Sequence, residues 1–290
     1  MLTPEHLHGL KNLSLAARQA AEGFLNGAHA SRRPGAGLEF SQYRPYQPGD
    51  DLRRLDWRLA ARSDRYYLRE SEVDTSLSVH LVLDASASMN HRDDNDLTKL
   101  DYARLLLAAL AYLAQRQGDA VGLTILGPGG LRHLPPRADP RQLPRLTHAL
   151  ETAEAAGRFP AAAALAPLTA RRQRALTVCV SDLYEEESEI SSLLTRLRAA
   201  SGEVLLLHLM AHNELQFSYQ GAITFKDLEN GSTMQIDTDQ QRGAYQQQLQ
   251  AWLRDTAHTA RRRGFDYHQL STADPLDEAL RGFLRKRGRS

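Results

Sequence analysis

Oxygen-bearing side chains gather at two points of the sequence in a pattern that suits a hard cation. Asp84, Ser86 and Ser88 occupy alternate positions directly after an apolar run, and Asp182 follows a second apolar run. In an open parallel sheet, ligands bind beyond the carboxyl ends of the strands, so both runs would deliver these residues to one edge. Carboxylate and hydroxyl oxygens favour Mg²⁺ over the transition metals. We therefore take these residues as a candidate metal site.

The elements that must position this site alternate between strands and helices. Short apolar runs predict strands at residues 79–83, 120–126, 131–134, 175–181, 203–210 and 265–270. Helical patterns predict helices at residues 100–117, 142–155, 161–171, 187–200, 239–263 and 275–287. The Asn230-Gly231 pair predicts a hairpin turn between strands at 223–229 and 233–237. The sequence thus predicts an α/β fold with a mostly parallel, doubly wound sheet and a β-hairpin in the C-terminal part.

The chain changes character near residue 75, which predicts an N-terminal segment at 1–75 and an α/β domain at 76–290. We expect the N-terminal segment to be irregular and to pack on the domain. Residues 31–72 contain nine Arg and seven acidic residues. This near balance favours ion pairing within the segment over phosphate binding. We assign a structural role to a motif within it, made of Gly49, Asp50, Asp51, Arg53, Asp56, Trp57 and Arg62. An acidic catalytic or metal-binding turn at Asp50 and Asp51 is the alternative.

Both motifs resemble those of known families. The Asp84-x-Ser86-x-Ser88 pattern, with a later strand ending at Asp182, resembles the metal-ion-dependent adhesion site of von Willebrand factor A domains. Residues 35–89 resemble a bacterial and archaeal family known as domain of unknown function 58. Its members carry a Gly-Asp-Asp block and an Asp-Trp pair ahead of a von Willebrand factor A-type domain. The resemblance implies that fold for the second part of this chain.

The adhesion-site resemblance also implies a ligand set. In that family a first-loop Asp and two Ser, a second-loop Thr and a third-loop Asp surround Mg²⁺, and an open position takes an acidic residue of a partner. Asp84, Ser86, Ser88 and Asp182 match by position, but the turn at residues 156–160 has no Thr. We therefore expect Mg²⁺ to bind weakly, no tighter than about 1 mM, or not at all. In the second case Arg158 would place its guanidinium against the two aspartates.

These features favour a non-enzymatic protein-interaction module, an adaptor or assembly factor. The family resemblance implies a MoxR-type AAA+ ATPase, or a client of that ATPase, as the partner. A hydrolase that uses the carboxylates of Asp84 and Asp182 is the alternative. The sequence has neither a Gly-x-Ser-x-Gly nucleophile elbow nor a phosphate-binding Gly-x-x-x-x-Gly-Lys-Ser/Thr loop, which favours the interaction module.

The composition of the chain bears on its partners and on its location in the cell. The 36 Lys and Arg against 35 Asp and Glu leave a net charge of +1, so we expect no nucleic-acid partner. Cys179 is the single cysteine and lies in an apolar run, where free Cys behaves as a small hydrophobic residue. The longest apolar stretch, residues 105–114, is shorter than the roughly 20 residues of a membrane span. With no signal-peptide pattern at the N-terminus, we expect a cytoplasmic protein.

Overall fold

A computed structural model describes residues 12–30, 42–45, 66–70, 77–94, 96–127, 130–159, 173–184, 187–228 and 231–287. The contacts divide the chain into one unit of residues 1–24 and 77–290 and a second unit of residues 25–76. The predicted division into 1–75 and 76–290 placed residues 1–24 in the N-terminal segment instead. In the second unit, strands β1 (Gln42–Pro45) and β2 (Tyr67–Glu70) pair in antiparallel fashion.

The proposed structural motif of the N-terminal segment falls outside the residues that the structure describes. Its role therefore stays a prediction. The residues concerned are Gly49, Asp50, Asp51, Arg53, Asp56, Trp57 and Arg62.

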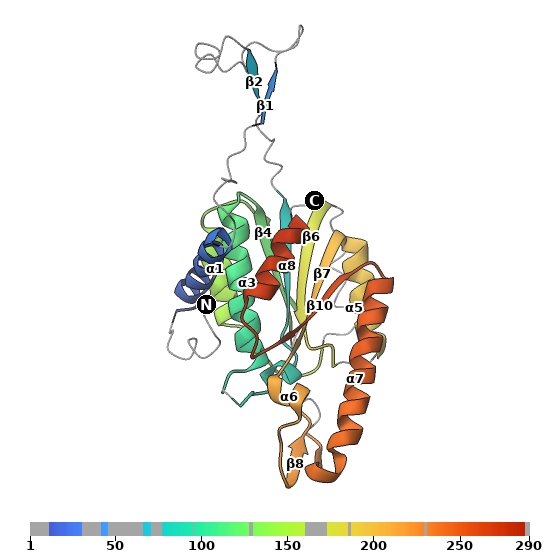
Figure 1. Cartoon of the computed structure of the whole chain (residues 1–290). Coiled ribbons are helices and arrows are strands. Elements are labelled where there is room, and N and C mark those ends of the chain that lie inside the picture. Colours follow the sequence, from blue (N-terminus) through green and yellow to red (C-terminus); the bar gives the residue numbers. More distant parts are fainter. Residues whose placement is uncertain are drawn as a thin grey trace. The chain divides into compact units, whose positions relative to one another are not determined.

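A central sheet in the order β10-β7-β6-β3-β4-β5 forms the larger unit (Figure 1). Its strands are β3 (Ser78–Asp84), β4 (Ala120–Gly127), β5 (Gly130–Arg137), β6 (Gln173–Ser181), β7 (Ser201–Met210) and β10 (Asp266–Ser271). All neighbours pair in parallel except β5, which runs antiparallel to β4 at the edge. Strands buried on both faces read as apolar runs, which is why the sequence reveals them. The predicted fold class, a mostly parallel α/β sheet with a separate hairpin, is confirmed.

Helices cover both faces of the sheet (Figure 1). On one face α3 (Lys99–Arg116) packs on β3 and β4 and contacts α4 (Gln142–Glu151) and α8 (Asp277–Arg287). On the other face α5 (Glu187–Ala200) packs on β7, and α7 (Thr238–Arg262) packs on β10. None of the described helices has the length and apolar character that crossing a bilayer requires.

One buried cluster shows how the α5–α7 face is filled. It joins Val82, Cys179 and Leu206, which are register partners on three neighbouring strands, to leucines of α5 and to Ala260 of α7. Cys179 is fully buried there, as expected for a small hydrophobic residue. The sheet therefore has a packed core on this face and holds its strand ends in fixed positions.

Two of the described α-helices were not predicted. The buried face of α1 (Leu13–Ala30) consists largely of alanines, which give a weak hydrophobic signal. The helix α6 (His212–Gln216) is too short for a periodic pattern. The helix predicted at residues 161–171 lies outside the described residues.

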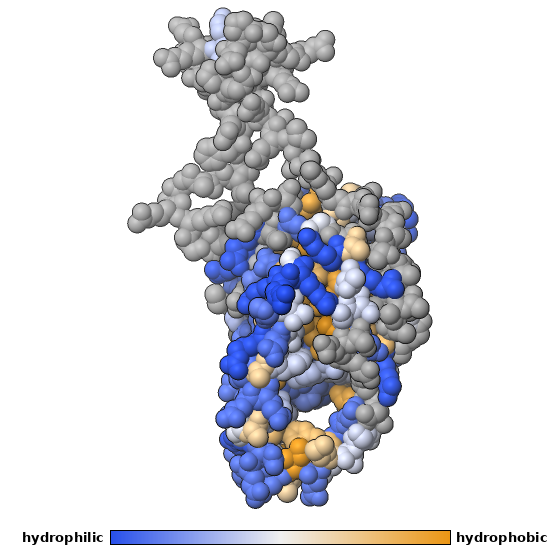
Figure 2. Space-filling model, turned by 90° about the vertical axis from the view of Figure 1, so that its right-hand side faces the viewer, coloured by the Kyte–Doolittle hydropathy of each residue, from blue (hydrophilic) through white to orange (hydrophobic). Residues whose placement is uncertain are grey.

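The predicted hairpin forms from β8 (Ala222–Lys226) and β9 (Thr233–Asp237). Gly231 lies in its turn with φ of +76°, a conformation that favours glycine. Aromatic rings of Phe217, Tyr219, Phe225 and Tyr245 pack at its base, with 4.3 Å between the Phe217 and Tyr245 centroids. Figure 2 shows hydrophobic side chains at this end of the molecule, where Met234 is 63% exposed.

Candidate functional site

The parallel pairing of β3 with β6 brings Asp84 and Asp182 to the same edge of the sheet. Leu83 and Val180 are register partners, so the residues that follow them leave the sheet side by side. We call this the carboxyl edge, because the parallel strands end there. Both aspartates are fully buried. The structure thus places the two predicted carboxylates together.

Hydrogen bonds link the predicted site residues into one chain. Asp84 Oδ1 accepts from the backbone N–H of Ser86 at 2.9 Å. The hydroxyls of Ser86 and Ser88 lie 3.0 Å apart, and Ser88 Oγ donates to Asp182 Oδ1 at 3.1 Å. On the other side, Ser181 Oγ donates to Asp84 Oδ2 at 2.6 Å. All of the predicted ligand residues therefore lie together, and Ser181 joins them.

A lysine that sequence reasoning missed completes the cluster. Lys99, the first residue of α3, donates from Nζ to Asp182 Oδ2 at 2.6 Å and to Glu214 Oε1 at 3.0 Å. Its side chain is 0% exposed. The Tyr184 ring centroid lies 4.6 Å from Nζ, within range of a cation–π interaction. We call Asp84, Asp182, Lys99 and Glu214 the edge cluster.

Asp93 holds α6, and thereby Glu214, in place. It accepts hydrogen bonds from the backbone N–H groups of His212 and Asn213 and from the Thr272 hydroxyl. Burial alone would raise the pKa of Asp93, but these hydrogen bonds outweigh it and the pKa is lowered. Glu214 Oε2 also accepts from the backbone of Ala211 at 2.8 Å, so the carboxylate is fixed at the first turn of α6.

Burial and neighbouring charge shift the protonation equilibria here. Burial, together with the Asp182 carboxylate, raises the pKa of Asp84 to about 6. Burial by itself would lower the pKa of Lys99, but the attraction of Asp182 and Glu214 raises it. Burial lowers the pKa of His208 to about 4, so its ring is neutral at pH 7. That ring bridges the carbonyl of Asp182 and the hydroxyl of Tyr267.

The residues present do not fit a divalent cation in this arrangement. Both oxygens of Asp84 and both oxygens of Asp182 already accept hydrogen bonds, one of them from an ammonium at 2.6 Å. Within the described ranges, no group of three His, Cys, Asp or Glu side chains is arranged to hold a metal ion. On the side of the missing threonine, the backbones of residues 85–87 and 156–157 bond directly to each other. The expectation of weak Mg²⁺ binding stays a prediction.

Arg158, the proposed charge substitute, lies elsewhere. Its side chain is exposed, and no described hydrogen bond or ion pair joins it to Asp84 or Asp182. The neighbouring Phe159 is buried instead. A sequence signal for Lys99 did exist. It is one of only four Lys among the 36 basic residues, and it begins the helix that follows the Asp-x-Ser-x-Ser loop.

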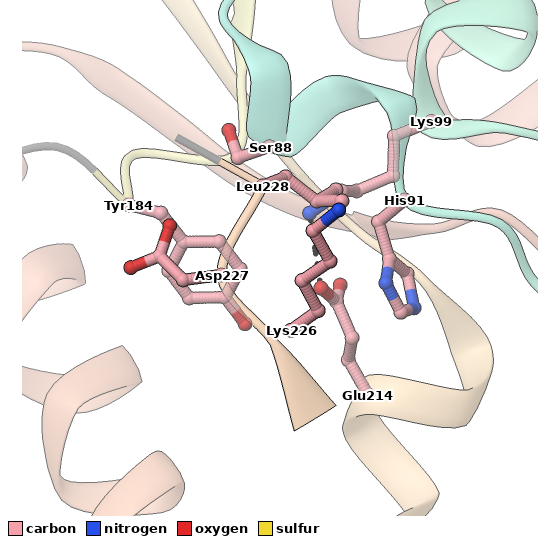
Figure 3. A pocket seen from close by; sticks show the side chains of 8 residues that line it. All are labelled: Ser88, His91, Lys99, Tyr184, Glu214, Lys226, Asp227 and Leu228. Carbon is pink, nitrogen blue, oxygen red and sulfur yellow. Dashed lines mark hydrogen bonds and ion pairs between the residues drawn. The ribbon is translucent and has the colours of Figure 1, made fainter. Parts of the chain in front are cut away.

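A pocket of about 270 Å³ opens beside the edge cluster. Figure 3 shows its walls, with Tyr184 and His91 on opposite sides and Lys226 and Asp227 reaching in from the hairpin. Tyr184 is 40% exposed and Leu228 is 44% exposed. We call it the edge pocket, defined by Ser88, His91, Lys99, Tyr184, Glu214, Lys226, Asp227 and Leu228.

Comparisons with known proteins show which proteins this chain is similar to. The chain is 29% identical over 274 residues to the uncharacterized proteins Rv1480 of Mycobacterium tuberculosis and Mb1516 of Mycobacterium bovis, covering 93% of this chain and 86% of each relative. Similar solved structures include BatB from Bacteroides thetaiotaomicron, with a TM-score of 0.49, 15% identity and coverage of 74% of this chain and 100% of that chain. Another is the SpRpn10 VWA domain, with a TM-score of 0.39, 11% identity and coverage of 71% and 94%. A family model described as "Protein of unknown function DUF58" matches residues 42–254, and the chain therefore belongs to the DUF58 family.

Proposed function

We propose that this protein is a non-enzymatic interaction module, an adaptor or assembly factor, that binds its partner at the edge pocket. The observation that carries the proposal is the composition of the pocket mouth. There the exposed side chains of Tyr184 and Leu228 stand beside polar groups that line the pocket, among them Ser88 and Glu214. Aromatic and aliphatic anchors beside a few fixed polar groups are typical of the centre of a protein interface.

The burial of the carboxylates argues against the hydrolase alternative. A catalytic acid or base must come within hydrogen-bond reach of the substrate. Asp84 and Asp182 are both 0% exposed, and their oxygens are occupied by serine, backbone and lysine donors. A substrate in the edge pocket would meet Ser88 and Tyr184 before either aspartate.

The second part of this proposed function is the identity of the partner. Membership of the DUF58 family, together with the resemblance drawn from residues 35–89, makes a MoxR-type AAA+ ATPase or its client the candidate. The test is calorimetric titration of the full chain with the MoxR-type ATPase of its own host. Leu228→Glu should weaken binding at least about tenfold, because it buries a charge at the centre of the interface.

A matched control separates the pocket from general surface effects. Leu15→Glu introduces the same charge at a leucine that is 48% exposed on α1, and it should leave the affinity unchanged. Equal weakening by both variants would contradict the pocket as the binding surface. No binding of the ATPase by the unchanged protein would contradict this partner.

A further inference from the structure

We propose that the ammonium of Lys99 is the resident cation of the carboxyl edge, and that it joins the loops there without a divalent metal. A bound divalent cation holds several oxygen ligands of a protein together. Lys99 does this directly. It binds Asp182, which follows β6, and Glu214, which follows β7. Ser88 extends the link to the loop that follows β3, through its bond to Asp182.

The Lys99 ammonium makes its contacts with groups of the protein itself. A lysine ammonium has three donor hydrogens and no acceptor. Two contacts go to carboxylate oxygens at 2.6 and 3.0 Å, and the Tyr184 ring lies on a further side at 4.6 Å. The Lys99 side chain is 0% exposed, so its ammonium is shielded from solvent. Lys99 therefore differs from a bound metal ion in leaving no open position for a carboxylate of a partner.

The charge of the cluster explains why a cation is needed. Asp84, Asp182 and Glu214 bring three carboxyl groups to the buried edge, and Lys99 is the ammonium that contacts two of them. A buried ion whose partner is removed is strongly unfavourable. A divalent ion added to the intact cluster would instead meet the repulsion of an ammonium that already occupies Asp182. The same side chain thus compensates the carboxylates and excludes a metal.

This inference predicts that a metal site appears when the ammonium is removed. Lys99→Ala frees Asp182 Oδ2 and Glu214 Oε1 and leaves space between them, close to the Ser88 hydroxyl. An all-oxygen set of this kind suits Mg²⁺ or Mn²⁺. We expect Lys99→Ala to melt earlier than the unchanged protein in EDTA, and 5 mM MnCl₂ to raise its melting temperature by about 5 °C. The unchanged protein should melt at the same temperature with EDTA and with MnCl₂.

Three variants make the test specific. Lys99→Met removes the charge but keeps the space filled, so it should melt early without recovery in MnCl₂. Lys226→Ala removes an exposed lysine of the edge pocket and should behave as the unchanged protein in both conditions. Lys99→Ala combined with Asp182→Asn should lose the recovery, because it removes a ligand.

Direct binding gives the second readout, by the loss of the free Mn²⁺ signal in electron paramagnetic resonance. The inference would be overturned if the unchanged protein bound Mn²⁺ at submillimolar concentration and Asp182→Asn abolished that binding. It would also be overturned if Lys99→Ala folded but did not bind Mn²⁺. If Lys99→Ala does not fold in EDTA, refolding from urea with and without MnCl₂ decides. Recovery only with MnCl₂ supports the inference, and equal failure overturns it. None of these measurements uses a partner, so they are independent of the proposed function.

Discussion

On β3, His80 and Asp84 carry polar side chains that respond to burial in opposite directions. His80 Nε2 lies 2.8 Å from the hydroxyl of Thr124, which also contacts His133 at 2.9 Å. Burial, and then the nearby His133, lower the pKa of His80 to about 4. Burial and the Asp182 carboxylate raise the pKa of Asp84 to about 6. The folded protein therefore favours the neutral form at both positions.

The shift at His80 predicts a loss of stability in acid. The pKa of His80 is about 6.5 in the unfolded chain and about 4 in the folded protein. Between pH 4 and pH 6.5 the unfolded state therefore binds more protons than the folded state. The contribution of His80 is therefore complete above pH 6.5 and is lost as the pH falls towards 4, by at most about 3 kcal/mol. In urea unfolding at pH 7.5 and 4.5, His80→Gln should lose less stability than the unchanged protein.

The variant must be compared with the unchanged protein, because Asp84 changes the stability with pH in the opposite direction to His80. Its folded-state pKa is raised, so its contribution grows as the pH falls through 6 towards its unfolded value. His148→Gln, at an exposed position of α4, is the matched control and should keep the pH dependence of the unchanged protein. If His80→Gln keeps that pH dependence as well, the ring is not held neutral.

At the scale of elements, the β4–β5 edge depends on a close backbone approach. A β-carbon at Gly122 would lie 2.7 Å from the backbone nitrogen of Pro136 and 2.8 Å from its Cδ. The strand register shifts at this place, between Val121 and Leu123. Backbone and ring atoms cannot move away as a flexible side chain would. The antiparallel edge strand therefore requires glycine at position 122.

Two glycine substitutions should consequently have opposite effects. Gly122→Ala should destabilise the protein by about 1–3 kcal/mol, because the strands must separate. Gly243→Ala, within α7, should stabilise it by about 0.5–1 kcal/mol, since alanine is the better helix former and no described atom lies within 4 Å of the added carbon. Urea unfolding midpoints measure both. A neutral Gly122→Ala would show that the two strands can separate at no cost.

At the scale of the whole molecule, the start of α1 is part of the unit that holds the sheet. The Tyr112 hydroxyl of α3 donates to Glu22 at 2.9 Å, and the backbone of Leu13 donates to Glu151 of α4 at 3.3 Å. The alanine face and Phe24 of α1 are buried. Residues far apart in sequence thus share one core, and loss of α1 packing should destabilise the entire unit.

Phe24→Ala should lower the free energy of unfolding of the sheet-containing unit by about 3 kcal/mol, through lost apolar burial and the cavity left behind. Phe24 is 5% exposed, whereas Leu15 on the same helix is 48% exposed. Leu15→Ala is therefore the control and should change stability by less than about 0.5 kcal/mol. Thermal melting followed by near-ultraviolet circular dichroism measures both. Equal effects would mean that α1 does not pack as described.

The sequence by itself determined the sheet, the hairpin and the place of the polar edge. Parallel strands covered on both faces must be apolar along their length, so their runs are visible without any knowledge of their neighbours. The Asn230-Gly231 turn and the Asp84-x-Ser86-x-Ser88 pattern are local features of the same kind. A local pattern reports burial and backbone conformation, and these properties depend on a few adjacent residues.

Only the tertiary structure decided which charges meet. Lys99 finds Asp182 and Glu214 at separations of 83 and 115 residues, and these contacts exist because β3, β6 and β7 end side by side. Considered locally, a lysine at the first position of a helix is unfavourable, because the helix dipole is positive there. The place of Arg158 in the second loop predicted that it would be the cation near the two aspartates, but its side chain is exposed. Ion pairing depends on the order of strands in the sheet, and no stretch of sequence around a single residue contains that order.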